Sequence, residues 1–105
     1  MRRGDVWWAR LPQPTGLRPV VLMTRDDALH VRTRVTVIPL STKVRDIETE
    51  VRLGPSDGLP RAGVANADEL VTIPKSCLER RIAALKSEKI SALDDAVRFA
   101  LALDR

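Results

Sequence analysis

The sequence is poor in the residues that build disulfides and metal sites. Its 105 residues include one cysteine, Cys77, and one histidine, His30. A lone cysteine cannot form an intrachain disulfide, and one cysteine with one histidine cannot complete a structural zinc site. A pair of histidines for acid–base catalysis is likewise excluded for one copy of the chain. We therefore expect no metal and no cofactor, and a reduced, cytoplasmic setting.

Aromatic residues and long apolar runs are scarce as well. Aromatic residues make up 3% of the chain, and no apolar run approaches the length of a membrane span. Arg2 and Arg3 are not followed by an apolar stretch, so we expect neither a signal peptide nor a membrane partner. The sequence has no glycine-rich phosphate loop, dinucleotide fingerprint or nucleophile elbow. Its length predicts a single domain over residues 1–105.

Positive charge is in excess, and the excess lies in the first half. Residues 1–45 carry nine Lys and Arg against three Asp, a net charge of +6, whereas residues 46–105 carry nine against eleven acids. Eight of the first nine cations are arginine, whose planar guanidinium binds phosphate oxygens in pairs. This asymmetry predicts a polyanionic partner such as nucleic acid, with a solvated basic face as the alternative.

Short β-branched and apolar runs between turn residues predict a mainly β protein. We expect strands over 5–11, 19–24, 32–40, 49–53, 63–66 and 70–73, and a loop over 54–60. Residues 74–80 can form a turn of helix, and 81–85 fit either strand or helix. From Ser87 the apolar spacing predicts a C-terminal helix with Ser87 as its N-cap. The set predicts a small barrel or a curled antiparallel sheet packed by that helix.

Arg18 stands directly before an apolar run that is typical of a strand buried on both faces. Pro19 biases Arg18 toward an extended backbone, which places the guanidinium at the mouth of the strand. Ser41 follows the 32–40 strand, so neighbouring strands would bring the two residues together. The alternatives are an Arg18 ion pair and a Ser41 hydroxyl that caps the strand end. A guanidinium and a hydroxyl suit RNA cleavage by the substrate's own 2′-hydroxyl, which needs a positioned phosphate and charge stabilisation.

Five segments, taken together and in order, resemble the MazF/PemK family of toxin endoribonucleases. They read RRGDVWW from Arg2, GLRPVVLMT from Gly16, VTVIPLST from Val35, VANADELVTI from Val64 and LKSEKI from Leu85. The likeness runs from Arg3 to about Leu103. It implies an SH3-like, CcdB/MazF-type small barrel closed by a C-terminal helix, and a homodimer whose groove takes single-stranded RNA.

The resemblance also implies a toxin of a type II toxin–antitoxin system. Such a toxin cleaves RNA sequence-specifically without metal, leaves 2′,3′-cyclic phosphate and 5′-hydroxyl ends, and is inhibited by a small acidic, MazE-like antitoxin. Messenger RNA is the expected target, with ribosomal and transfer RNA as further candidates. The alternatives are a CcdB-like gyrase poison that is not an enzyme and an SH3-like module that binds RNA without cutting it.

The family's catalytic arginine falls on Arg18, and its catalytic threonine falls on Ser41, where serine keeps the hydroxyl and loses the methyl group. A guanidinium stays protonated near neutral pH. Arg18 is therefore expected to stabilise the phosphorane charge, with proton transfer to the leaving 5′-oxygen as an added role, and Ser41 to donate a hydrogen bond to the same phosphate. The loop at 13–16 is shorter than in many members, so it lacks their serine and glutamate.

Further residues are expected to contact RNA: Thr42, Lys43, Arg45, Asp68 and Glu69. For Lys43 and Arg45 the alternative is a solvated loop, and for Asp68 and Glu69 it is a bulge that pairs with arginines. Trp7 and Trp8 should point to opposite faces of their strand, one toward the core and the other toward a base or a dimer interface. Cys77 is expected to act as a small apolar residue.

Overall fold

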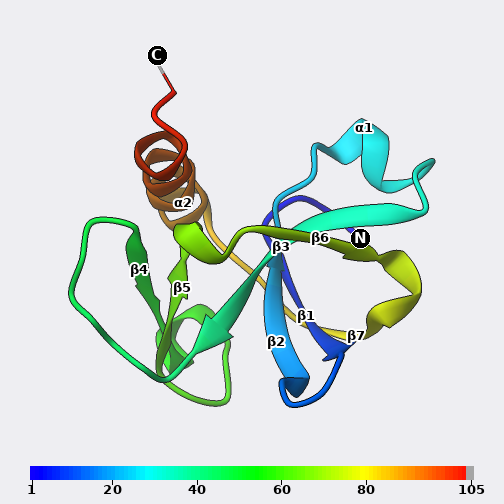
Figure 1. Ribbon diagram of the computed structural model, residues 1–105, viewed down its shortest axis with the longest axis horizontal. Coiled ribbons are helices and arrows are strands. Elements are labelled where there is room, and N and C mark those ends of the chain that lie inside the picture. The colour runs from blue at the N-terminus through cyan, green and yellow to red at the C-terminus, as the bar shows by residue number, and fades with distance from the viewer. Residues whose placement is uncertain (104–105) are drawn as a thin grey trace.

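A curled antiparallel sheet with one long helix packed on it forms the part of the chain that the computed structural model describes, residues 1–103 (Figure 1). Its elements in chain order are β1 (Asp5–Leu11), β2 (Gly16–Leu22), α1 (Asp26–Leu29), β3 (Arg34–Ser41), β4 (Glu50–Leu53), η1 (Pro55–Asp57), β5 (Gly63–Asn66), η2 (Ala67–Glu69), β6 (Val71–Pro74), η3 (Lys75–Cys77), β7 (Leu78–Ala84) and α2 (Ser87–Ala100).

Strand β3 is the centre of the sheet. The strand order is β4-β5-β3-β2-β1-β7, and β6 also pairs with β3. The first half of β3 pairs with β6, and its last two residues, Leu40 and Ser41, pair with β5. A mainly β fold with a C-terminal helix is confirmed. The expected closed barrel is not confirmed, because within residues 1–103 no pairing joins the two ends of the sheet.

The apolar run in β2 is buried on both faces, as the sequence predicts. Val20, Val21 and Leu22 are each 0% exposed. Val21 packs in a core shared with α2, whereas Val20 and Leu22 pack in a second core inside the curl of the sheet. A strand between two apolar layers reads as a continuous apolar run instead of an alternating one. The same two cores bury consecutive residues of β3, because Val37 packs in the second core and Ile38 packs in the core shared with α2.

Helix α2 closes the first core and lies on the side of β4 and β5 (Figure 1). Leu93 and Ala96 are its buried residues. The N-cap is Lys86 and makes no side-chain capping bond, so the prediction of Ser87 as N-cap is wrong: Ser87 is the first helical residue. Within residues 1–103, no helix has both the length and the apolar character needed to cross a bilayer.

Three local features differ from or complete the sequence analysis. Residues 81–85 belong mainly to a strand, because β7 runs to Ala84 and pairs with β1. The two tryptophans of β1 separate as expected: Trp7 packs on the second core, and Trp8 lines a surface hollow. Cys77 is partly buried against the second core, which confirms its apolar role.

Candidate active site

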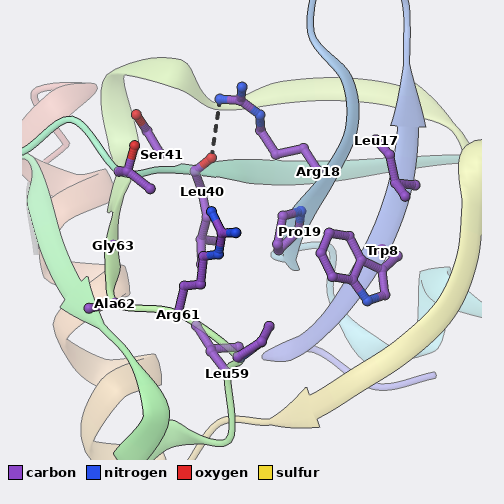
Figure 2. A pocket seen from close by; sticks show the side chains of 12 residues that line it. Trp8, Leu17, Arg18, Pro19, Leu40, Ser41, Leu59, Arg61, Ala62 and Gly63 are labelled. Atoms are coloured by element: carbon purple, nitrogen blue, oxygen red, sulfur yellow. Dashed lines mark hydrogen bonds between the residues drawn. The ribbon is translucent and has the colours of Figure 1, made fainter.

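Arg18 and Ser41 meet where β2 and β3 run side by side. The two strands pair antiparallel from Val20 opposite Pro39 to Leu22 opposite Val37. Arg18 precedes this paired segment and Ser41 follows it, so both residues reach the same edge. The Nη1 of Arg18 donates a hydrogen bond of 3.3 Å to the carbonyl oxygen of Leu40, the residue directly before Ser41 (Figure 2). The structure therefore brings the two residues together.

The guanidinium of Arg18 makes few polar contacts with the described part of the chain. Within residues 1–103, no carboxylate lies at ion-pair distance from it, and its one side-chain hydrogen bond goes to a neutral carbonyl. The side chain is half-buried. These residues therefore contain no acidic partner for Arg18, as the alternative of an Arg18 ion pair would require. A half-buried guanidinium with free donors can bind an anion.

The hydroxyl of Ser41 does cap its strand, yet its proton stays free. Its Oγ accepts a 3.0 Å hydrogen bond from the backbone N–H of Lys43. That bond occupies one lone pair of the oxygen, so the O–H can still donate. On the other side, Gly63 approaches so closely that a Cβ there would lie 2.6 Å from the carbonyl oxygen of Ser41. The lack of a side chain at Gly63 lets β5 fix the backbone of Ser41.

Arg18 and Ser41 line a hollow of about 560 Å³, which we call the Arg18 cleft (Figure 2). Its wall is apolar and hydroxyl-bearing, and it holds two arginines and no carboxylate. The lining residues are Trp8, Leu17, Arg18, Pro19, Leu40, Ser41, Thr42, Leu59, Pro60, Arg61, Ala62 and Gly63. A phosphate would therefore meet cations and hydroxyl donors without repulsion from an acid in the wall.

Arg18 and Ser41 also line a second hollow, of about 610 Å³, beside the β1–β2 loop. We call it the loop hollow. Its charged lining comprises Arg18, Lys43, Arg45, Glu50 and Glu69. Glu50 is engaged by the fold, because its carboxylate accepts bonds of 2.8 to 3.1 Å from the backbone N–H groups of Arg45 and Asp46. The two key residues thus stand on the border between two cavities that together make an extended surface.

The other residues expected to contact RNA divide into two groups. Thr42 lines the Arg18 cleft, and Lys43, Arg45 and Glu69 line the loop hollow. Asp68 lines neither hollow. Its carboxylate accepts a 3.2 Å hydrogen bond from the hydroxyl of Thr49, and its backbone N–H donates to the side chain of Asn66. Asp68 therefore ties η2 to the segment before β4.

Sequence reasoning missed Arg61. This residue enters the Arg18 cleft from the loop between β4 and β5, and Figure 2 shows its side chain extending toward Leu40. The sequence marked that segment only as a loop, and no periodic pattern identifies which way a loop arginine points. The one signal in the sequence was its position directly after Pro60, at the end of the predicted loop.

The chemistry open to the Arg18 cleft is that of cations and hydroxyls. Among residues 1–103, no three His, Cys, Asp or Glu side chains gather in a way that could hold a metal ion. Arginine and serine can orient a phosphodiester and stabilise negative charge that develops on it.

Comparison with known proteins gives a consistent result. Residues 2–101 match the model of a family described as the PemK-like, MazF-like toxin of type II toxin–antitoxin systems. The chain is 34% identical over 104 residues to a probable endoribonuclease MazF5 of Mycobacterium tuberculosis, an alignment that covers 98% of this chain and 94% of that protein. It is 38% identical over 87 residues to endoribonuclease MazF3 of the same organism, covering 83% and 84%.

Solved structures agree. The fold superposes on the M. tuberculosis toxin MazF-mt6 with a TM-score of 0.88 and 35% identity, covering 96% of this chain and 99% of that one. A mycobacterial endoribonuclease, solved in complex with its cognate antitoxin, gives a TM-score of 0.88 at 27% identity, covering 100% and 98%.

Proposed function

Because the chain belongs to the PemK-like, MazF-like toxin family, we propose that it is the toxin of a type II toxin–antitoxin system and cleaves single-stranded RNA. The reaction is an attack by the 2′-hydroxyl of the substrate on the adjacent phosphate. It leaves a 2′,3′-cyclic phosphate and a 5′-hydroxyl end. The proposed reaction needs no metal, because the substrate supplies the nucleophile and the protein supplies the positive charge.

Arg18 and Ser41 carry the proposal. The observation behind it is that, within residues 1–103, a guanidinium without an ion pair and a hydroxyl with a free proton line the same cleft, on strands that fix both backbones. Arg18 stabilises the charge that builds up on the phosphorane, and its protonated guanidinium is placed to pass a proton to the leaving 5′-oxygen. Ser41 donates a hydrogen bond to the same phosphate. Preorganised donors of this kind act most strongly where charge develops in the transition state.

The RNA on either side of the cleaved bond binds in the two hollows. Thr42 contacts it in the Arg18 cleft, and Lys43, Arg45 and Glu69 contact it in the loop hollow. Phosphate contacts by such cations fix the position of the strand. We assign Asp68 to holding η2 and give it no RNA contact.

Two partners belong to the same proposal. The first is an acidic, MazE-like antitoxin, whose charge complements the cations of the two hollows; a related endoribonuclease is known in complex with its antitoxin. The second is another copy of this chain, in a homodimer that acts in the cytoplasm. Light scattering on the purified protein measures the mass of the particle directly, and a monomeric mass at working concentration would contradict the homodimer.

Cleavage of single-stranded RNA in EDTA tests the function. We expect the purified protein to cut a mixed RNA pool, and the Arg18→Ala variant to cut it far more slowly. Arg98→Ala is a suitable control, since Arg98 lies on α2 and pairs with Asp95 outside both hollows. Intact RNA would contradict the proposal and favour a gyrase poison, or an RNA-binding module if the RNA is bound. Equal cutting by wild type and Arg18→Ala would contradict the role of Arg18.

A further inference from the structure

The loop that carries Arg61 is held at its start by a compact turn. It begins with η1, where the carboxylate of Asp57 accepts a 2.9 Å hydrogen bond from the backbone N–H of Gly54. Gly58 ends the turn in a left-handed conformation, with φ of 91°. Leu59 then packs in the first core, the one shared with α2, where it is 5% exposed. Its backbone N–H donates to the carbonyl oxygen of Gly54. The segment before Arg61 is thus anchored by both hydrogen bonds and burial.

The other side of Arg61 is anchored as well. Gly63 begins β5 and packs against the backbone of Ser41, and Val64 pairs with Ser41 in the sheet. Arg61 therefore lies two residues after a core anchor and two residues before the strand that supports Ser41. Its guanidinium is presented from an ordered loop whose position is tied to the same residue as the candidate hydroxyl.

The charge of Arg61 has no counterpart in the described chain. Within residues 1–103, no carboxylate lies at ion-pair distance from its side chain, and the Arg18 cleft has no acid in its wall. Two guanidinium groups that face one cleft repel each other unless an anion lies between or beside them. In Figure 2 the head of Arg18 lies beside the carbonyl oxygen of Leu40, whereas the head of Arg61 is drawn over the side chain of Leu40.

We propose that Arg61 binds the phosphate next to the scissile one, and so fixes the register of the RNA strand while Arg18 acts on the reacting phosphate. This assignment rests on the proposed function, because it takes RNA as the substrate of the cleft. Arg61 is a substrate-binding residue and touches no reacting atom. Its interaction with the neighbouring phosphate is the same in the ground state and in the transition state, so it contributes to binding and leaves the chemical step unchanged.

Salt dependence of binding measures this contact directly. The probe is a pool of 2′-O-methyl RNA, which the protein can bind but which has no free 2′-hydroxyl to attack. Each phosphate contact on a single strand contributes about 0.7 to the slope of log Kobs against log salt. Arg61→Ala should lower the magnitude of the slope by about that amount, and Arg61→Lys, which keeps the charge, should restore it.

Arg32→Ala is the matched control, because Arg32 is an exposed arginine that lines neither the Arg18 cleft nor the loop hollow. It removes the same charge from the chain. If Arg32→Ala changes the slope as much as Arg61→Ala does, the effect comes from net charge and the assignment is wrong. A thermal melt of each variant shows that the proteins compared are folded.

Kinetics on cleavable RNA separate the two arginines. For Arg61→Ala we expect KM to rise roughly 10- to 100-fold, the size of one lost charge-assisted hydrogen-bonded contact, with kcat nearly unchanged. A fall in kcat as large as the rise in KM would place Arg61 on the reacting phosphate and overturn the assignment. If the wild type cleaves and Arg61→Ala behaves like Arg32→Ala, Arg61 alone is misassigned. If the wild type leaves RNA intact, the proposed function itself fails.

Discussion

Arg3 and Arg18 both belong to the N-terminal part of the fold, but their guanidinium groups differ in the hydrogen-bond partners that they meet. Arg3 donates from Nη2 to the carboxylate of Asp94 at 2.6 Å and from Nε to the carbonyl oxygen of Met23 at 2.9 Å. Within residues 1–103, the one side-chain hydrogen bond of Arg18 goes to the carbonyl oxygen of Leu40, at 3.3 Å. Arg3 therefore joins the N-terminus to α2, whereas Arg18 keeps most of its donors for a ligand.

The contrast extends to the surroundings of each arginine. Near α2, cations have acidic partners. The Nζ of Lys89 lies 3.7 Å from Oδ2 of Asp57, and the Nη1 of Arg98 lies 2.8 Å from Oδ1 of Asp95. In the Arg18 cleft, two arginines face a wall without acids. The ion pairs beside α2 therefore contribute to cohesion, whereas the two arginines of the Arg18 cleft are left for an anionic ligand. Variants at Arg3 and Arg18 should accordingly separate loss of stability from loss of activity.

The largest effect is expected for Arg18→Ala. Removing a preorganised donor from the reacting phosphate should lower the cleavage rate by about 10²- to 10³-fold. The free energy of unfolding should hardly change, because within residues 1–103 the side chain makes one hydrogen bond, a long one of 3.3 Å. Single-turnover cleavage and urea unfolding measure the two quantities. A variant that loses stability and activity together would place Arg18 among the structural arginines.

A somewhat smaller loss is expected for Ser41→Ala, about 10²-fold in rate, because the free O–H donor disappears. Ser41→Thr keeps the hydroxyl and should retain most of the activity. Thr42→Ala is the matched control for a neighbouring hydroxyl that lines only the Arg18 cleft. Should Thr42→Ala lose more activity than Ser41→Ala, Thr42 is the functional donor.

Gly63→Ala tests the support beneath Ser41. A Cβ at this position would lie 2.6 Å from the Ser41 carbonyl oxygen, so β3 and β5 must move apart. We expect a loss of about 1–3 kcal/mol in the free energy of unfolding, typical of overpacking, with slower cleavage by the folded protein. Gly54→Ala is the control, since its Cβ would meet its nearest atom at 3.4 Å. Equal behaviour of the two variants would mean that Gly63 does not position Ser41.

The smallest effect is expected for Arg3→Ala, and it should fall on stability. The ion pair is about one-third exposed on both sides, so its loss with the Met23 bond should cost about 1 kcal/mol. The folded variant should cleave RNA at the wild-type rate. Arg25→Ala, which removes a highly exposed ion pair with Asp27, should leave the midpoint of urea unfolding unchanged. A cleavage defect in folded Arg3→Ala would break the contrast between Arg3 and Arg18.

The sequence predicts the strands well because their pattern is local. The run Val20–Leu22 reads as a doubly buried strand, and the structure places it between two apolar cores. The meeting of Arg18 with the end of β3 also follows from the sequence, since both residues flank apolar strands that become neighbours. The C-terminal helix is correct in type and start, although Ser87 is not its cap.

What could not be predicted depends on contacts between distant segments. Whether a curled sheet closes depends on pairing between its two end strands, which no single segment encodes. Residues 81–85 have apolar spacing that fits either period, and pairing with β1 decides for a strand. Arg61 was missed because a loop side chain points where its anchors direct it, and those anchors are a core position at Leu59 and a close approach at Gly63.

The chemistry of the cut ends tests the central claim most directly. RNA cleaved by the purified protein in EDTA should carry 2′,3′-cyclic phosphate and 5′-hydroxyl ends, and 2′-O-methyl RNA of the same sequence should stay intact. Ends that bear a 5′-phosphate, or cutting of the 2′-O-methyl RNA, would contradict attack by the substrate's own hydroxyl at a site built from Arg18 and Ser41.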